Sequence, residues 1–332
     1  MGAAYSEPRA IASRWFPAFV TTLPSLAGKT FVVTGCTTGT GIVLAQTAAS
    51  KGARVFMLNR DSPRAAAALA AVAAAAAAGG SAVHVPCDLT SFASVRAAAA
   101  AVAAAATEVD ALVNNAGVMA LEDVATADGF DVQMQTNHLS HFLLTRELFP
   151  LLEAAAAARG EARIVNHSSG ARHVPGGPLD RKYLEAGGAL GGNGASMFFG
   201  GARWVRYHHT KLANAVFTVA LDARLRARGS RVKAVCAAPG LAATNLQVTT
   251  AATGGFGASW IMALAQSAED GTMPLLFAAA APAVAGGELY EPKGITGPPA
   301  RVDLAKERLA GEARARDVLW AASEAAVGPW AL

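Results

Sequence analysis

Thr34-Gly35-Cys36-Thr37-Thr38-Gly39-Thr40-Gly41 is the stretch of sequence that decides the fold. The apolar run Phe31-Val32-Val33 precedes it, and the helical pattern Ile42-Val43-Leu44-Ala45-Gln46 follows it. This order predicts a strand, a glycine loop and a helix. Glycines permit the tight turn and a close approach of backbone to a pyrophosphate, and the helix N-terminus offers free N–H groups to phosphates. The stretch therefore predicts a dinucleotide-binding loop, with a simple glycine-rich turn as the alternative.

Tyr207 and Lys211 stand four residues apart in YHHTKLANAVFTVALDARL, a segment that reads as helix. Residues i and i+4 of a helix lie on the same face. A free tyrosine has a pKa of about 10, and a neighbouring ammonium group lowers that pKa because it favours the phenolate. The pair therefore predicts a proton donor and acceptor. The spacing alone leaves open a surface pair without a catalytic role.

Six segments between residues 29 and 245 resemble, in the same order, the motifs of the short-chain dehydrogenase/reductase family. The glycine loop resembles TGxxxGxG, and residues 114–117 resemble NNAG. Asn137 matches the family's helix asparagine, and Ser169 matches its catalytic serine. Tyr207 and Lys211 match the YxxxK pair. Pro239-Gly240 with Thr244 matches the PGxxxT segment. The phrases NHLSHFLLT, RIVNHSSGAR and YHHTKLANAVFT are similar to the retinol-dehydrogenase-like branch, which includes the WW-domain oxidoreductases.

The resemblance implies a catalytic set of Asn137, Ser169, Tyr207 and Lys211. Tyr207 is expected to donate a proton to a carbonyl oxygen, and Ser169 to hydrogen-bond and orient the same oxygen. Lys211 is expected to lower the pKa of Tyr207 and to bind the nicotinamide ribose. Asn137 is expected to hold a water that relays protons through Lys211.

The expected cofactor is NADP(H). The second predicted strand ends at Leu58-Asn59-Arg60 without the carboxylate that binds the ribose of NAD, and an arginine can pair with the 2′-phosphate of NADP. The alternative is a surface arginine. Asp88 is implied to accept a hydrogen bond from the adenine amine. The full set of expected cofactor-binding residues is Gly35, Thr37, Thr38, Gly39, Gly41, Arg60, Asp88, Leu89, Asn115, Ala116, Gly117, Tyr207, Lys211, Pro239, Gly240 and Thr244.

Strand and helix patterns alternate along most of the chain. This alternation predicts an α/β fold, a doubly wound parallel sheet (Rossmann fold) in a single domain with helices on both faces. The predicted strands are residues 31–35, 53–58, 81–87, 110–114, 164–167 and 231–237. The predicted helices are residues 40–51, 62–78, 91–106, 129–153 and 205–228.

We expect three parts in the chain: an N-terminal arm (1–27) that packs on the domain, the Rossmann-fold domain (28–300), and a C-terminal helical extension (301–332) with a helix from 301 to 327. Residues 245–275 are expected to form a substrate lid, because apolar side chains alternate there with glycines. The glycine-rich insertion 187–201 is either a flap on the pocket or a solvent loop.

Composition narrows the classes of function. The net charge is +4 over 332 residues, and the scattered Lys and Arg give little support to a nucleic-acid role. Cys36, Cys87 and Cys236 form no CxxC pair and are odd in number, which indicates free thiols in a reducing compartment. The histidines show no metal spacing apart from His138 and His141, which we interpret as ordinary helix residues, so no metal is expected. The apolar patch at residues 15–20 is too short for a membrane span. We expect a cytoplasmic protein, with a plastid left open.

These observations favour an NADP(H)-dependent oxidoreductase that interconverts an apolar aldehyde or ketone and its alcohol, with Tyr207 as general acid and base. The substrate class follows from the segments expected to line the pocket, which are rich in Phe, Met, Leu, Ala and Trp and carry little charge. An NADPH-binding scaffold or redox-sensing protein with a protein partner is the alternative. Relatives often pair through the two long helices, here 129–153 and 205–228, so a homodimer is left open.

Overall fold

The computed structural model describes residues 11–187, 190–195, 200–244 and 263–332. In this part of the chain eight strands form one sheet in the order β3-β2-β1-β4-β5-β6-β7-β8. All neighbouring strands pair in parallel except β7 and β8, which are antiparallel. The strands are β1 (Thr30–Thr34), β2 (Arg54–Asn59), β3 (Ser81–Pro86), β4 (Ala111–Asn114), β5 (Ala162–His167), β6 (Val232–Ala237), β7 (Glu288–Pro292) and β8 (Pro299–Asp303).

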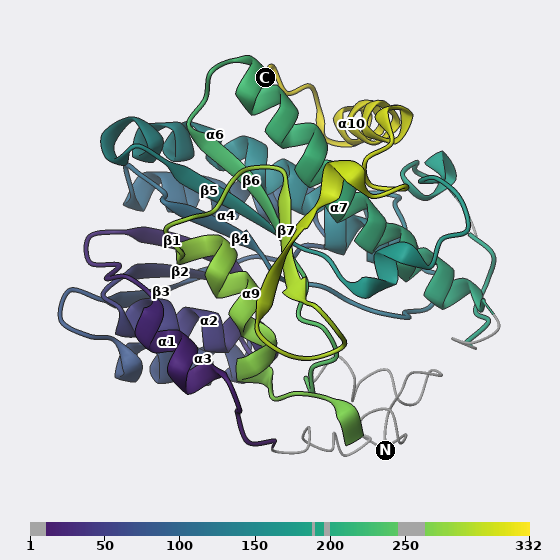
Figure 1. Cartoon of the computed structure of the whole chain (residues 1–332). Coiled ribbons are helices and arrows are strands. Elements are labelled where there is room, and N and C mark those ends of the chain that lie inside the picture. The colour runs from purple at the N-terminus through teal and green to yellow at the C-terminus, as the bar shows by residue number, and fades with distance from the viewer. Residues whose placement is uncertain (1–10, 188–189, 196–199, 245–262) are drawn as a thin grey trace.

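Helices cover both faces of the sheet (Figure 1). One face carries α2 (Gly39–Ser50), α3 (Pro63–Ala75) and α9 (Ala268–Ala280), and the other carries α4 (Phe92–Ala105), α6 (Ser140–Arg159) and α7 (Ala202–Ala227). Side chains alternate between the two cores, since Val32 of β1 packs in one and Phe31 and Val33 in the other. The predicted doubly wound α/β fold is confirmed.

The strand order places a switch point between β1 and β4, which are neighbours although β2 and β3 separate them in the chain. In open α/β sheets, ligands bind beyond the carboxyl ends of the strands at such a point. β1 ends at Thr34 and β4 ends at Asn114. The glycine loop and the segment after Asn114 therefore emerge side by side.

The long helix expected at 129–153 is divided into three parts. A short α5 (Val132–Met134) leads into a π-helical turn (Gln135–Leu139), and α6 then runs to Arg159. The alanine run 154–158 extends α6 beyond the predicted end, since alanine is the best helix former. Gly160 ends the helix in the left-handed conformation with φ of 91°.

The prediction of a helix from 301 to 327 was wrong over its first part. Residues up to Asp303 belong to β8, which pairs with β7 from Glu288 to Pro292, and a 3₁₀ turn follows (Leu304–Lys306). The helix α10 begins only at Ala313 and ends at Val327. Pairing with a neighbouring strand overrides the local helical pattern here. Strand β7 and helix α9 were not predicted from the sequence.

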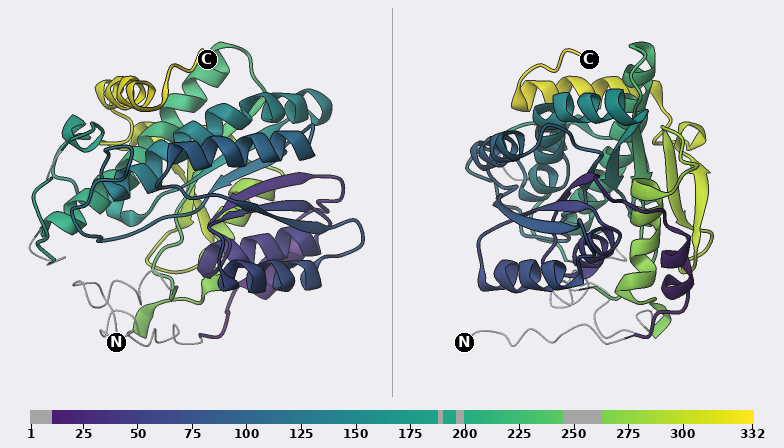
Figure 2. Two further views of the ribbon diagram at one scale, coloured as in Figure 1. Left: turned by 180° about the vertical axis from the view of Figure 1, so that it is seen from behind. Right: turned by 90° about the vertical axis from the view of Figure 1, so that its left-hand side faces the viewer.

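The C-terminal helix α10 covers part of α7 and α6 (Figure 2). The ring of Trp320 lies 5.1 Å from that of Phe142 on α6, and the guanidinium of Arg224 on α7 lies 3.9 Å from the Trp320 ring centre. Trp330 stacks on Trp320 at 5.4 Å. A homodimer that paired through this part of α6 and α7 would require α10 to move away.

The N-terminal arm contains α1 (Phe16–Thr22), which contacts α9 (Figure 2). The backbone N–H groups of Trp15 and Phe16 donate to Oδ1 of Asp270 at 3.0 and 2.8 Å. Most of the expected lid, residues 245–262, lies outside the described residues, while residues 268–275 form the start of α9. Among the helices described, none has the length and apolar character to cross a membrane.

Candidate active site

Tyr207 and Lys211 project from the first half of α7 and are 5% and 4% exposed. The Lys211 Nζ donates to the backbone carbonyl of His167 at 3.1 Å, and it lies 5.7 Å from the centre of the Tyr207 ring. The helical spacing therefore places the two side chains together, as predicted. The carbonyl of His167 at the end of β5 fixes the position of the ammonium group.

Ser169 follows β5 and begins a 3₁₀ turn (Gly170–His173). Its Oγ accepts from the backbone N–H of Ala171 at 3.2 Å. The same side chain lies near enough to Tyr207 to lower the tyrosine pKa. The end of β5 and the first half of α7 thus bring the two hydroxyl groups together.

Burial dominates the ionisation of this pair. It raises the pKa of Tyr207 to about 12, against the lowering by Ser169. It lowers the pKa of Lys211 to about 8, because the ammonium group is cut off from water. Burial thus outweighs the lowering by Ser169, and the expected lowering of the Tyr207 pKa by Lys211 stays a prediction.

Asn137 lies in the π-helical turn before α6, an irregularity often found at functional sites. Its Nδ2 donates to the Val118 carbonyl at 2.9 Å and to Thr210 Oγ1 at 2.8 Å. Its Oδ1 accepts from the backbone N–H of Val118 at 2.8 Å. The side chain expected to hold a water is therefore engaged with protein groups, and it ties the 118 loop to α7.

The side chains of Asn137 and Lys211 both lie close to Gly117. A Cβ at this glycine would lie 3.3 Å from Asn137 Oδ1 and 3.4 Å from Lys211 Nζ. The loop after β4 therefore lies in close contact with both side chains, and a Cβ here would press on Asn137. The residues predicted from separate motifs converge at the carboxyl end of the sheet.

Close packing holds the glycine loop against the loop after β4. A Cβ at Gly41 would lie 2.1 Å from the Gly35 carbonyl oxygen, and one at Gly35, whose φ is 72°, would lie 2.9 Å from Ala116. Asn115 joins the two loops, because its Oδ1 accepts from Thr40 Oγ1 at 2.8 Å and its Nδ2 donates to the Thr34 carbonyl at 2.9 Å.

The glycine loop fits an anionic cofactor. In the described part of the chain, the N-cap residue Thr38 makes no side-chain bond to α2, so the first N–H groups of this helix remain available to phosphates. Asn59 at the end of β2 accepts from the Cys36 N–H at 2.6 Å through Oδ1, while its buried Nδ2 has no partner among the residues described.

The other expected cofactor residues lie along the same edge of the sheet. Thr244 packs over Gly39, where a Cβ would lie 3.3 Å from Thr244 Cβ. Arg60 is exposed directly after β2. The Asp88 carboxylate, after β3, accepts from the N–H and hydroxyl of Thr90 at 2.9 and 2.8 Å. Three more of them make local contacts or turns: the Leu89 carbonyl accepts from Ser140, the Pro239 carbonyl accepts from Gln266, and Gly240 has a φ of 66°.

Thr34 and His141 belong to the site but were not predicted. His141 Nδ1 lies 3.0 Å from the Asn137 carbonyl oxygen, and its Nε2 lies 2.9 Å from Thr34 Oγ1. Burial lowers the pKa of His141 to about 4. The spacing of four residues from Asn137 was the sequence signal for this contact. His138 instead contacts Ser323 of α10 at 2.9 Å.

Comparisons of the sequence with known proteins show which family it resembles. A family model described as short chain dehydrogenase matches residues 29–179. Polyprenol dehydrogenase of Mus musculus is 33% identical over 273 residues, which cover 80% of this chain and 75% of the relative. Retinol dehydrogenase 12 of Homo sapiens is 35% identical over 210 residues, covering 63% of this chain and 61% of the relative, less than two thirds of its length.

Solved structures are also similar. An uncharacterized protein from Mycobacterium Paratuberculosis has a TM-score of 0.71 and 31% identity, over 94% of this chain and 98% of its own. A structure from Beutenbergia cavernae, described as an NAD(P)-dependent gluconate 5-dehydrogenase with NADP bound at low occupancy, has a TM-score of 0.55 and 26% identity, over 77% and 91%. The chain therefore belongs to the short-chain dehydrogenase/reductase family, in its retinol-dehydrogenase-like branch.

Proposed function

We propose that this protein is an NADP(H)-dependent oxidoreductase that interconverts an apolar aldehyde or ketone and its alcohol. The observation that carries the proposal is the buried pair of Tyr207 and Lys211, whose Nζ lies 5.7 Å from the centre of the tyrosine ring. Ser169 lies near enough to Tyr207 to lower its pKa. Lys211 Nζ reaches the carboxyl end of β5 at the His167 carbonyl and lies beside Gly117 in the loop after β4. A binding protein would need no such set of proton-handling groups.

The chain's own residues handle the proton and the orientation of the substrate. Ser169 donates a hydrogen bond to the carbonyl oxygen and fixes its direction. Tyr207 gives its hydroxyl proton to the same oxygen, and the ammonium group of Lys211 stabilises the phenolate that forms. The bound nicotinamide supplies the hydride chemistry. Asn137 binds Val118 in the loop after β4 and Thr210 on α7, and it thereby keeps Lys211 next to Tyr207.

The preference for NADP(H) rests on Arg60. It is exposed directly after β2, where a carboxylate would repel a 2′-phosphate, and Asp61 comes only after it. A guanidinium group can bind a phosphate through two parallel N–H donors. The Asn59 Nδ2 group, buried and without a partner among the described residues, lies at the end of the same strand and offers a further donor.

The apolar character of the substrate rests on the surroundings of Tyr207. Met119, Ala120 and Trp204 form a small buried cluster with its ring. These side chains offer no charge to an acidic or sugar substrate. The similar polyprenol dehydrogenase and retinol dehydrogenase 12 are named for apolar alcohols. The three buried free thiols support a reducing compartment such as the cytoplasm.

Loss of NADPH absorbance tests the proposal. The purified protein is mixed with NADPH and a panel of aliphatic and isoprenoid aldehydes and ketones, and a parallel series uses NADH. We expect turnover with NADPH and a lower kcat/KM with NADH. Tight binding of NADPH without turnover of any carbonyl would contradict the proposal and favour the scaffold function.

A further inference from the structure

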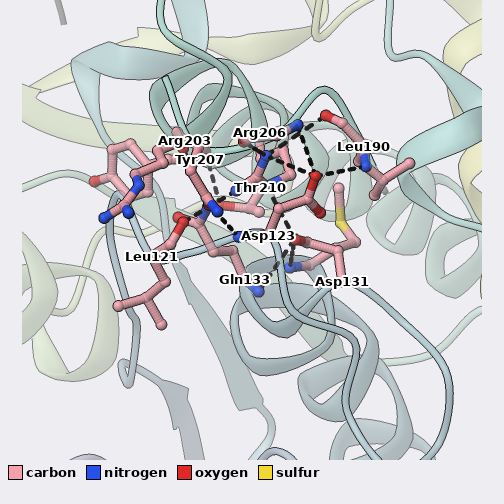
Figure 3. A network of polar contacts seen from close by, with 12 residues as sticks. Leu121, Asp123, Asp131, Gln133, Leu190, Arg203, Arg206, Tyr207 and Thr210 are labelled. Atoms are coloured by element: carbon pink, nitrogen blue, oxygen red, sulfur yellow. Dashed lines mark hydrogen bonds and ion pairs between the residues drawn. The ribbon is translucent and has the colours of Figure 1, made fainter. Parts of the chain in front are cut away.

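Arg206, the neighbour of Tyr207 in the chain, is a buried cation that faces away from the catalytic groups. It is 1% exposed, and Figure 3 shows it within a network of polar contacts. Its Nη1 donates to the backbone carbonyls of Gly192 at 2.9 Å and of Leu190 at 3.5 Å. Its Nη2 donates to the Leu121 carbonyl at 3.0 Å. The guanidinium group is thus bound mainly to backbone of two loops.

Asp123 binds the backbone N–H groups of the same segment. Its Oδ2 accepts from the backbone N–H groups of Leu190 and Gly192 at 2.7 and 2.8 Å. The backbone N–H of Asp123 donates to Asn193 Oδ1 at 2.7 Å. The carboxylate lies 3.7 Å from Arg206 Nη1, so the charges of the two side chains partly balance. Asp123 thus binds the N–H groups of Leu190 and Gly192, and Arg206 binds the carbonyl groups of the same two residues.

Two glycines permit this arrangement. Gly191 and Gly192 have φ angles of 101° and 76°, in the region that other residues avoid. The conformation turns N–H and carbonyl groups of one short segment toward the Arg206 and Asp123 side chains. From its sequence, the insertion 187–201 was expected to be either a flap on the pocket or a solvent loop. Residues 190–193 are instead bound on one side by a buried ion pair.

The segment also contacts the wall of the site. Trp204 Nε1 donates to the Ala195 carbonyl at 3.0 Å, and the indole ring lies edge-on to the Tyr207 ring at 6.1 Å. Ala120, in the same cluster, has a φ of 52° although it is not glycine. Such strain is found where the surrounding structure fixes a functional loop. A hydrogen bond therefore links residues 190–195 to Trp204 beside the catalytic tyrosine.

A second carboxylate connects Arg206 to the element that carries Asn137. Asp131 Oδ2 lies 3.2 Å from Arg206 Nε, and both side chains are almost fully buried. The Asp131 Oδ1 caps α5, accepting from the N–H groups of Gln133 and Met134 at 3.1 and 2.8 Å. The π-helical turn with Asn137 follows directly. One arginine thus joins the insertion, the 121–131 loop and α7.

We propose that Arg206 and Asp123 form a latch that fixes residues 190–195 as a wall of the substrate pocket, and that Arg206 thereby determines which apolar substrates fit beside Tyr207. Arg206 is a positioning residue, since it touches neither the catalytic groups nor the glycine loop. This inference rests on the proposed function for its effect on substrates. Its effect on the segment itself does not depend on catalysis.

The test compares Arg206→Met, Gly192→Ala and the control Arg226→Met. Arg226 lies on the same helix and pairs with Asp222, but it is exposed and lies far from the segment in sequence. Gly192→Ala strains the backbone of the segment and leaves the buried charges in place, so it serves if Arg206→Met fails to fold. Amide hydrogen exchange of the peptide covering 190–195 is one readout. The other is the ratio of kcat/KM for hexanal to kcat/KM for all-trans-retinal, with the Kd of NADPH.

We expect exchange at 190–195 to become at least tenfold faster in Arg206→Met and Gly192→Ala. The ratio of the two kcat/KM values should change at least fivefold, mainly through KM, while the Kd of NADPH stays within twofold. Arg206→Lys should restore only part of the selectivity, because a lysine cannot reach all three carbonyls and both carboxylates. Unchanged exchange would overturn the latch, and faster exchange with an unchanged ratio would overturn its role in specificity. A wild-type protein that turns over no carbonyl contradicts the proposed function instead, and the exchange result then still decides the latch.

Discussion

The imidazole Nδ1 of His141 lies 3.0 Å from the backbone carbonyl oxygen of Asn137. A carbonyl only accepts, so Nδ1 carries the proton and Nε2 accepts from the Thr34 hydroxyl, 2.9 Å away. The Thr34 Oγ1 in turn accepts from the backbone N–H groups of Asn115 and Ala116 at 3.0 Å. A neutral histidine therefore connects the π-helical turn to the loops that flank the cofactor site.

Replacing His141 by leucine should destabilise the fold. The substitution leaves the Asn137 carbonyl and the Thr34 hydroxyl buried with one partner fewer. We expect the free energy of unfolding to fall by about 2–6 kcal/mol, if each of the two buried groups costs about 1–3 kcal/mol when it loses this partner. Urea unfolding followed by circular dichroism measures the change. His173→Leu, at an exposed position, is the control, and an equal loss in both variants would contradict this account.

Buried histidines should make the protein sensitive to acid. Burial lowers the pKa of five of them below the ordinary value of about 6.5, so between that value and about 3–4 the unfolded state binds more protons than the folded state. The stability they contribute is complete above pH 6.5 and is lost as the pH falls. The pKa values are about 3 for His138 and His167, and about 4 for His141, His208 and His209.

Thermal unfolding between pH 7 and pH 4.5 measures this effect. Each of these histidines should remove about 1.4 kcal/mol of stability per pH unit below 6.5. We expect the melting temperature to fall continuously over this range, and the decrease to be smaller in a His209→Phe variant. A melting temperature that is the same at pH 7 and pH 5 would show that these rings are protonated at no cost in the folded protein.

Gly41→Ala should abolish cofactor binding. The new Cβ would lie 2.1 Å from the Gly35 carbonyl oxygen and 2.6 Å from Asn115 Nδ2, so the glycine loop must shift. We expect the Kd of NADPH, measured by fluorescence titration, to rise at least about a hundredfold. Gly176→Ala is the matched control, because a Cβ there meets nothing within 4 Å. Wild-type binding by Gly41→Ala would exclude this loop as the phosphate site.

Arg60→Ala should weaken the binding of NADPH much more than the binding of NADH. If the guanidinium binds the 2′-phosphate, its removal costs a charge-assisted hydrogen bond of about 1.5–3 kcal/mol, or roughly a 10- to 150-fold rise in Kd. NADH has no such phosphate, and its Kd should change less than twofold. Titration of both cofactors into the same variant makes the comparison. An equal change in the Kd of NADPH and of NADH would show that Arg60 does not bind the 2′-phosphate.

The sequence predicted the elements that position the site, for physical reasons that are local. The run from Phe31 to Gly41 specifies a buried strand, a loop and a helix start, and the structure has all three. Tyr207 and Lys211 share a helix face because their spacing requires it. The convergence of Gly117 with Asn137 and Lys211 follows from the strand order, which the alternation of strands and helices did not specify.

Other features depend on contacts between distant parts of the chain. The strand β8 forms because β7 pairs with it, and neither residue pattern alone distinguishes Arg301-Val302-Asp303 from the start of a helix. The pKa of Tyr207 depends on how deeply α7 is buried, which spacing does not reveal. The binding of residues 190–193 by Arg206 and Asp123 joins segments about 70 residues apart, so composition suggested only a glycine-rich loop.

The rate of NADPH-dependent carbonyl reduction by Tyr207→Phe tests the central claim most directly. The substitution removes one hydroxyl group and leaves the ring in its cluster with Trp204. We predict that kcat falls by about 10²–10⁴-fold, the usual contribution of general acid catalysis, while the Kd of NADPH stays within twofold of wild type. A kcat within threefold of wild type would contradict the assignment of Tyr207 as the proton donor.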